Sequence, residues 1–158
     1  DYEEEGYWRD VGTVKAYWEA NMDLLGMSPR YDLSNREWPI RTDPSYGPPA
    51  SLVNCHVDNA LIGEGTRAVD ALIRHSVIGR NVRIEPGAEI TDSVIFDNTR
   101  IGAKARLRRV IVDRDNKIPA GIELGDAEGS PPPTLTAPAD PFVLPKPTAE
   151  EELSGRSS

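Results

Sequence analysis

Among the carboxylates near the start of the chain, Asp10 is the one whose position would allow its side chain to take part in chemistry. It follows a predicted short strand, and Gly12 and Thr13 come soon after it, so the turn can present the carboxylate at the edge of a cleft. Aspartate is also common at turns and helix caps. The alternative is therefore that Asp10 only caps the turn before the following helix.

Cationic side chains recur further along the chain at every seventeenth position, at Arg83, Arg100 and Lys117. Like charges stacked in one column cost stability, so this ridge is a candidate contact for an anion or an acidic partner surface. The alternative is a solvated ridge, whose charges interact weakly through water. Two other columns alternate in sign and stabilise themselves: Glu89, Arg106 and Glu123, and Arg80, Asp97 and Arg114.

The element that must position these columns is a repeat over residues 60 to 125. Its large apolar residues are five or six apart, which a helix of about 3.6 residues per turn cannot keep on one face. A triangular coil of short parallel strands can, and at least three stacked repeats are normally needed to bury its core. The columns that predict this parallel β-helix are Leu61, Ile78, Ile95 and Val112; Ile84, Ile101 and Ile118; Ile73, Ile90, Leu107 and Leu124; and Ala71, Ala88, Ala105 and Ile122.

The flanking segments have a different character. Residues 6–12 predict a short strand ending in a tight turn, and Thr13 is the predicted N-cap of a helix from Val14 to Leu25 that Gly26 ends. Residues 27–59 are Pro-rich and predict an irregular linker, which Trp38, Pro39 and Ile40 pin to a neighbouring surface. Residues 126–158 predict a Pro-rich, largely flexible tail, within which residues 141–145 could dock as an extended strand.

Composition narrows the class of protein. The net charge of −8 argues against a general nucleic-acid or anionic-membrane binder. The single cysteine, Cys55, excludes an internal disulfide framework and favours a reduced cytoplasm. The sequence contains no signal-peptide pattern and no apolar run of about 18 residues, so it predicts no membrane span.

Three segments resemble the bacterial glucose-1-phosphate adenylyltransferases: residues 7–25, residues 35–42, and residues 105–119 with their paired arginines. The resemblance covers roughly residues 6 to 125. It implies a left-handed parallel β-helix, built of hexapeptide-like repeats in 17-residue rungs, behind the last strand and helix of an α/β nucleotidyltransferase domain that occupies residues 1–26. The chain is then expected to be a fragment, inactive alone because the glycine-rich nucleotide loop is absent.

The resemblance also implies roles for individual residues. Asp10 would help to hold Mg²⁺, and Trp8 and Tyr7 would line the sugar side of the cleft, although aromatic packing at a domain boundary is their alternative. Arg114 would contact the phosphate of a nucleotide effector such as AMP, with Asp97 as a possible structural partner. Lys146 aligns loosely with a basic residue that binds sugar-bisphosphate activators.

The family's reaction joins ATP and glucose 1-phosphate into ADP-glucose and pyrophosphate for glycogen synthesis. The resemblance implies that a preceding domain binds both substrates. The coil is then expected to provide the contacts of a homotetramer and allosteric control.

Two other functions are compatible with the residues. Some hexapeptide-repeat proteins are acyltransferases that use a coil histidine as general base, and His75 is the candidate here. A surface histidine in a charge ladder is the favoured interpretation of His75, which shares its predicted column with Asp58, Asp92 and Arg109. The chain could also be a non-catalytic assembly or regulatory module.

Overall fold

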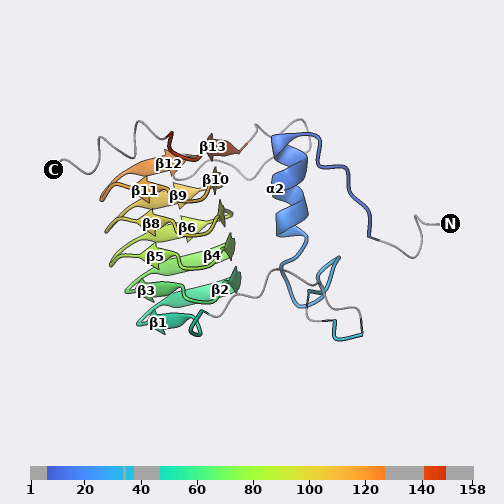
Figure 1. Ribbon diagram of the computed structural model, residues 1–158, viewed down its shortest axis with the longest axis horizontal. Coiled ribbons are helices and arrows are strands. Elements are labelled where there is room, and N and C mark those ends of the chain that lie inside the picture. The colour runs from blue at the N-terminus through green and yellow to red at the C-terminus, as the bar shows by residue number, and fades with distance from the viewer. Residues whose placement is uncertain (1–6, 34, 38–46, 127–140, 149–158) are drawn as a thin grey trace.

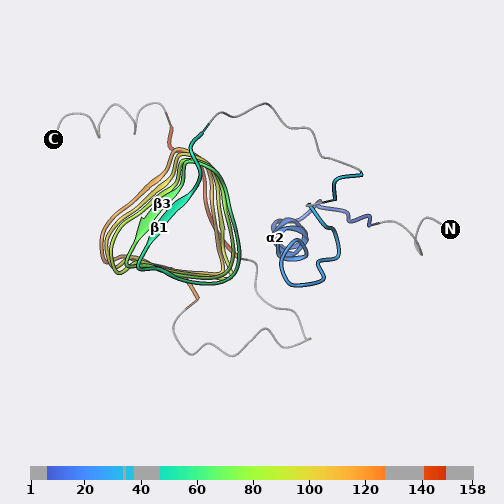
Figure 2. The ribbon, with the colours of Figure 1, turned by 90° about the horizontal axis from the view of Figure 1, so that it is seen from below.

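The computed structural model describes residues 7–33, 35–37, 47–126 and 141–148, and it confirms the predicted parallel β-helix. Short strands stack in successive rungs (Figure 1). Seen along the coil, the rungs have a triangular outline, and the helix α2 (Val14–Met22) lies beside one side of the triangle (Figure 2).

One side of the triangle is a five-stranded parallel sheet in the order β1-β3-β5-β8-β11. The other two sides belong to an eight-stranded sheet, because β4 bends and pairs with β6 through its first half and with β7 through its second. The first sheet contains β1 (Ser51–Val53), β3 (Arg67–Val69), β5 (Arg83–Ile84), β8 (Arg100–Ile101) and β11 (Lys117–Ile118). The second contains β2 (His56–Ile62), β4 (Leu72–Ile78), β6 (Glu89–Thr91), β7 (Val94–Ile95), β9 (Arg106–Arg108), β10 (Val110–Val112), β12 (Glu123–Gly125) and β13 (Phe142–Leu144).

The core is a stack of inward aliphatic side chains, one level per rung. Ile73, Ile90 and Leu107 lie directly above one another and are fully buried. Ile84 and Ile101 form the corresponding stack inside the five-stranded sheet. Their burial removes apolar surface from water, which is the main stabilising contribution to such a coil.

The first rungs are one residue shorter than predicted. Ser51 pairs with Arg67, and His56 with Leu72, whereas the later rungs keep the predicted spacing, as in the pairing of Leu72 with Glu89. Leu61 therefore pairs with Val77 rather than Ile78, and the predicted column was wrong at that position. The coil also begins with β1 at Ser51, before residue 60, because a shortened rung falls out of the repeat that the later rungs define.

The corners of the triangle explain the polar residues of the repeat. Each corner contains a residue with positive φ in successive rungs, a conformation that Gly, Asn and Asp adopt more readily than other residues. Along the three corners these residues are Asn54, Asp70, Gly87, Lys104 and Gly121; Asn59, His75, Asp92 and Arg109; and Gly65, Asn81, Asn98 and Asp115.

The predicted helix forms, but it is shorter than predicted. Thr13 caps it, because its Oγ1 accepts a hydrogen bond from the Ala16 N–H at 3.1 Å. The helix ends at Met22, although Leu25 remains buried beyond it. Met22 and Leu25 pack against Val94 and Ile111, an outward apolar stripe on the second sheet.

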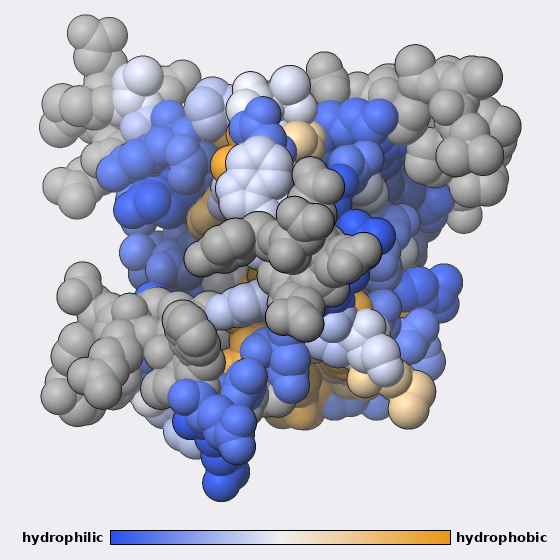
Figure 3. Space-filling view, turned by 90° about the vertical axis from the view of Figure 1, so that its right-hand side faces the viewer, coloured by the Kyte–Doolittle hydropathy of each residue, from blue (hydrophilic) through white to orange (hydrophobic). Residues whose placement is uncertain are grey.

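Trp18 fixes α2 to the coil. Its indole N–H donates to the Asp92 carbonyl at 2.8 Å, and the Arg109 guanidinium lies 5.2 Å from the ring centroid. Seen from the side of α2, apolar side chains show between polar ones (Figure 3). Val94 and Ile111 are nevertheless buried, because Met22 and Leu25 cover this part of the apolar stripe.

Residues 7–12 do not form the predicted strand. They pair with no other strand of the described chain, and an extended segment without a ladder partner is not a strand. The predicted strand over residues 141–145 is confirmed as β13, which adds to β10 in parallel. Trp38, Pro39, Ile40 and most of the predicted tail lie outside the described residues. In the described ranges, no helix is long and apolar enough to cross a membrane.

Candidate functional site

The segment before α2 is held in place by ion pairs. Arg9 pairs with Glu19 and Asp23 of the helix region, and the Tyr7 hydroxyl donates to Asp23 Oδ2 at 3.2 Å. Partial burial lowers the pKa of Arg9, but the hydrogen bond and charge of Asp23 outweigh it, so the pKa lies above its ordinary value. Partial burial, followed by the charge of Asp23, raises the pKa of Tyr7. This clamp fixes the chain on both sides of Trp8.

Asp10 is exposed and lies in the turn that this clamp positions. Its Oδ1 accepts a hydrogen bond from the Gly12 N–H at 3.0 Å, so it does cap the turn. A Cβ at position 12 would lie 3.3 Å from that oxygen, so a side chain there would require the Asp10 carboxylate to move by a few tenths of an ångström. The structure therefore shows the capping contact directly, and the carboxylate still faces solvent.

The side chains available near Asp10 as metal ligands can be compared with what Mg²⁺ requires. Among the described residues, no three His, Cys, Asp or Glu side chains gather in a possible metal site. Mg²⁺ usually takes only one or two protein carboxylates and completes its shell with water and substrate phosphates. An exposed carboxylate on a fixed turn fits a site of that kind.

The two predicted substrate contacts differ in their surroundings. The Trp8 side chain is 82% exposed, so it contributes nothing to the core of the described chain. Tyr7 instead contacts another aromatic residue, with its ring centroid 5.7 Å from that of Tyr31. Trp8 is therefore available to a ligand or another domain, whereas Tyr7 is partly engaged within the chain.

The two predicted effector residues are brought to the same corner of the coil. Lys146 follows β13, and its Nζ lies 3.1 Å from Asp115 Oδ2. Asn116 Nδ2 donates to the Pro145 carbonyl at 2.9 Å and so holds this end of the segment. Arg114 precedes Asp115 directly and is well exposed.

Asp115 is the residue that sequence reasoning missed at this corner. Its hydrogen bond with Lys146, and then that with Asn98, lowers its pKa; the charge of Arg114 contributes less. The regular recurrence of Asn81, Asn98 and Asp115 was visible in the sequence, but only docking of β13 brings Lys146 to it. The corner therefore contains two cations and two carboxylates: Arg114 contacts Asp113, and Lys146 contacts Asp115.

The predicted partner of Arg114 was wrong. Asp97 contacts Arg80, with the Nε–Oδ2 distance at 3.9 Å, and accepts a hydrogen bond from the Arg80 N–H. Arg114 Nε instead lies 3.8 Å from Oδ1 of the adjacent Asp113. Because that contact is long and exposed, the guanidinium can turn toward a ligand.

His75 occupies a corner with positive φ, as do Asn59 and Arg109. Its Nδ1 lies 2.6 Å from Asp92 Oδ1 on the next rung. Asp58 is not in that column, because it pairs with Arg74. The arrangement matches the favoured interpretation, a histidine within a ladder of polar corner residues.

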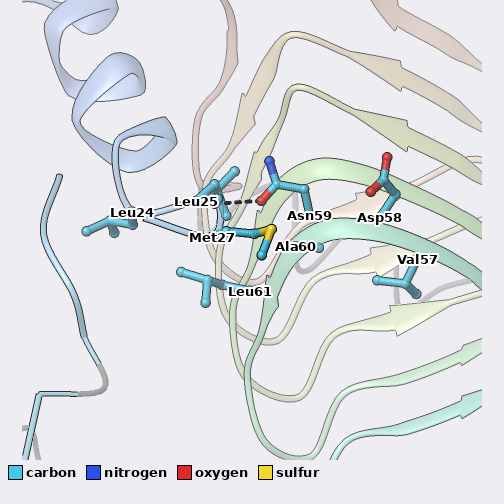
Figure 4. Close-up of a pocket in the computed structure, with 9 residues that line it drawn as sticks. Leu24, Leu25, Met27, Val57, Asp58, Asn59, Ala60 and Leu61 are labelled. Carbon is cyan, nitrogen blue, oxygen red and sulfur yellow. Dashed lines mark hydrogen bonds between the residues drawn. The ribbon is translucent and has the colours of Figure 1, made fainter. Parts of the chain in front are cut away.

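A pocket of about 570 Å³ lies between the end of α2 and the first rungs (Figure 4). Its lining is mostly aliphatic, including Leu24, Leu61 and the fully exposed Met27. Its polar groups are engaged: Asn59 Oδ1 accepts from the Gly26 N–H at 2.7 Å, and Asp58 lies 3.9 Å from Arg74. The pocket therefore offers apolar contact rather than a phosphate site.

Comparisons with known proteins agree with the fold. A family model described as GlmU-like, C-terminal hexapeptide, matches residues 48–130. The glucose-1-phosphate adenylyltransferase of Deinococcus radiodurans is 42% identical over 125 residues, which make up 75% of this chain and 30% of the relative. That of Thermodesulfovibrio yellowstonii is 41% identical over 124 residues, 78% of this chain and 30% of the relative. The chain thus spans about 30% of the length of these curated relatives.

Proposed function

Because the chain belongs to the GlmU-like, C-terminal hexapeptide family, we propose that it forms the C-terminal part of a glucose-1-phosphate adenylyltransferase. The observation that carries this proposal is the length of the similarity. The 125 aligned residues are more than the coil family model covers, so the similarity extends into the flanking residues. A coil shared by unrelated hexapeptide proteins does not account for that extension.

The proposed reaction transfers the adenylyl group of ATP to glucose 1-phosphate, giving ADP-glucose for glycogen synthesis and releasing pyrophosphate. Both substrates would bind to a domain preceding this chain, and this part alone would be inactive. Bound Mg²⁺ would neutralise charge on the phosphates. Within this chain, Asp10 would hold the metal, while Trp8 and Tyr7 would contact the sugar side of the cleft.

The proposed role of the coil is assembly and control. Arg114 and Lys146 are the residues we assign to a phosphorylated effector, since a guanidinium offers two aligned donors to phosphate and an ammonium adds a point charge. Their placement at one corner supports this assignment. Among the described strands β11 and β12 each end a sheet, and these edges would offer strand groups for contacts in a homotetramer. A cytoplasmic location completes the proposal.

The acyltransferase alternative rests on His75, and no further observation favours it. Its Nδ1 is directed to Asp92, and the relatives reported above are adenylyltransferases. A purely structural module remains the other alternative, and it differs from our proposal because it would bind no effector.

The effector assignment is tested by titrating the whole chain with AMP and with fructose 1,6-bisphosphate while its amide NMR signals are followed. We expect signals near Arg114 and Lys146 to move. Replacing Arg114 or Lys146 by Ala should weaken binding roughly 10- to 100-fold, the effect of losing one hydrogen bond to a charged group.

Arg80→Ala is the matched control, because Arg80 is another corner arginine of the same coil, two rungs before Arg114, and its side chain contacts Asp97 rather than Lys146 or Asp115. It should leave binding unchanged. The effector assignment would be contradicted if neither ligand bound the chain. It would also be contradicted if Arg80→Ala weakened binding as much as Arg114→Ala or Lys146→Ala does.

A further inference from the structure

Four cations form a ladder on the outer face of the five-stranded sheet. Arg67 pairs in register with Arg83, Arg83 with Arg100, and Arg100 with Lys117. All four side chains are exposed, and none makes an ion pair within the described part of the chain. Adjacent rungs of a sheet lie about 4.8 Å apart, so this basic ladder concentrates uncompensated positive charge.

The charge of the chain is distributed unevenly. The described residues contain as many acidic as basic side chains, 16 of each, although the whole chain has a net charge of −8. The excess acidic residues therefore lie in the segments outside the described ranges. The chain therefore contains both a basic ladder without ion-pair partners among the described residues and acidic segments of opposite charge.

The described residues that precede one of these acidic segments lie beside the ladder. Asn116, which holds the Pro145 carbonyl, directly precedes Lys117, the last cation of the ladder. Lys146 is held at the same corner by Asp115. Four residues after Lys146 the sequence contains three consecutive glutamates, Glu150, Glu151 and Glu152.

The distances allow these glutamates to reach the ladder. Four extended residues span at most about 14 Å, and three rung spacings from Lys117 to Arg67 also amount to about 14 Å. We propose that residues 150–152 dock on the basic ladder of their own chain and form an electrostatic clamp over the five-stranded sheet. The tether keeps the glutamates at an effective concentration in the millimolar range.

Zero-length carbodiimide crosslinking tests this proposal, because it joins a lysine amine only to a carboxylate in direct contact. Lys117 is the one amine of the ladder. We expect intrachain crosslinks from Lys117 to residues 150–152, and their loss in about 1 M salt, where the Debye length falls to about 3 Å. Lys104, an exposed lysine at another corner of the coil, should give none.

A mixture of ¹⁴N- and ¹⁵N-labelled chains distinguishes the possible occupants. Crosslinks only between differently labelled chains would show docking on a second copy, and crosslinks to Glu3, Glu4 or Glu5 would show that the other acidic terminus occupies the ladder. Either result, or the absence of any Lys117 crosslink, would overturn the proposal. Crosslinks from Lys146 are not counted, because that residue is close in sequence.

Neutral variants provide a second measurement. The triple substitution Glu150→Gln, Glu151→Gln and Glu152→Gln should shift the amide NMR signals of Arg100 and Lys117. The same substitution at Glu3, Glu4 and Glu5 removes the same charge and is the matched control, which should leave those signals in place. Equal signal shifts in both variants would indicate a general charge effect and would overturn the proposed docking of residues 150–152 on the basic ladder.

Discussion

Asp115 contributes to the attachment of the end of the described chain, beside the pairing of β13 with β10. It receives a hydrogen bond from Asn98 at 3.1 Å and contacts Lys146 at 3.1 Å, so it joins a corner ladder of the coil to the segment that follows β13. Because Lys146 is also a proposed effector contact, a phosphate that binds Lys146 competes with this carboxylate. The attachment of β13 and the binding of an effector are then linked through one side chain.

Acidification should weaken this attachment. The folded-state pKa of Asp115 lies below its ordinary value of 3.8, so the stabilisation is present above that pH and is lost as the pH falls through the lower folded-state value. Since both side chains are partly exposed, the contribution is at most about 1 kcal/mol. NMR signals of Val143 and Leu144 followed from pH 6 to pH 3 should report release of β13.

Asp115→Asn should reproduce that release at pH 6 and remove its pH dependence. Asp97→Asn is the control, since Asp97 contacts Arg80 and not β13. If the β13 signals of the Asp115 variant matched those of the unmodified chain, the pairing with β10 and the Asn116 hydrogen bond would hold the segment without Asp115, and the account of Asp115 would be wrong.

At the scale of elements, Trp18 attaches α2 to the coil together with the packing of Met22 and Leu25. Trp18→Ala should destabilise the chain by about 3 kcal/mol, the usual cost of removing a packed aromatic side chain. Trp18→Phe retains most of the packing and should cost about 1 kcal/mol for the lost hydrogen bond. Denaturant unfolding measures both values.

Hydrogen exchange locates the effect. In the Trp18→Ala variant the amides of α2 should exchange faster while those of β6 to β10 remain protected. Trp8→Ala is the matched control, because its side chain is 82% exposed and should change stability by less than about 0.5 kcal/mol. Equal effects of the two substitutions would contradict the docking role of Trp18.

The elements differ in how far the sequence predicts them. Inward side chains such as Ile90 and Leu107 must recur once per rung, so the regular part of the coil was predictable. The first rungs were not, because a rung shortened by one residue moves Leu61 to the outer stripe. The predicted strand before α2 does not form. Residues 7–12 have a suitable sequence, but no strand of the described chain lies beside them to pair with.

The site was less predictable than the fold. Asp10 could be identified as a turn carboxylate, and its contact with Gly12 is local in sequence. The corner that contains Lys146 depends on docking between segments far apart in the sequence, as in the Asn116–Pro145 hydrogen bond. Such contacts follow from the register of β13 on β10, which no local pattern specifies.

At the scale of the whole molecule, the coil connects the two regions to which we assign functions. The segment containing Asp10 is clamped to α2, α2 is packed on the outer stripe of the coil, and the corner with Arg114 and Lys146 belongs to the same stack of rungs. The proposed effector contacts at the corner and the carboxylate before α2 that we assign to the metal are thus connected through packed elements. This arrangement suits a part that controls a catalytic domain.

The most direct test of the proposed function joins this chain to the remaining part of one of its relatives. In a chimera, the chain replaces the corresponding C-terminal part of the Deinococcus radiodurans adenylyltransferase, and pyrophosphate release from ATP and glucose 1-phosphate is measured with Mg²⁺. We predict release in the chimera. We also predict a loss of about 2–4 kcal/mol in transition-state stabilisation, roughly 30- to 1000-fold in rate, for Asp10→Asn. A folded chimera that releases no pyrophosphate, or an Asp10→Asn variant with unchanged rate, would contradict the account.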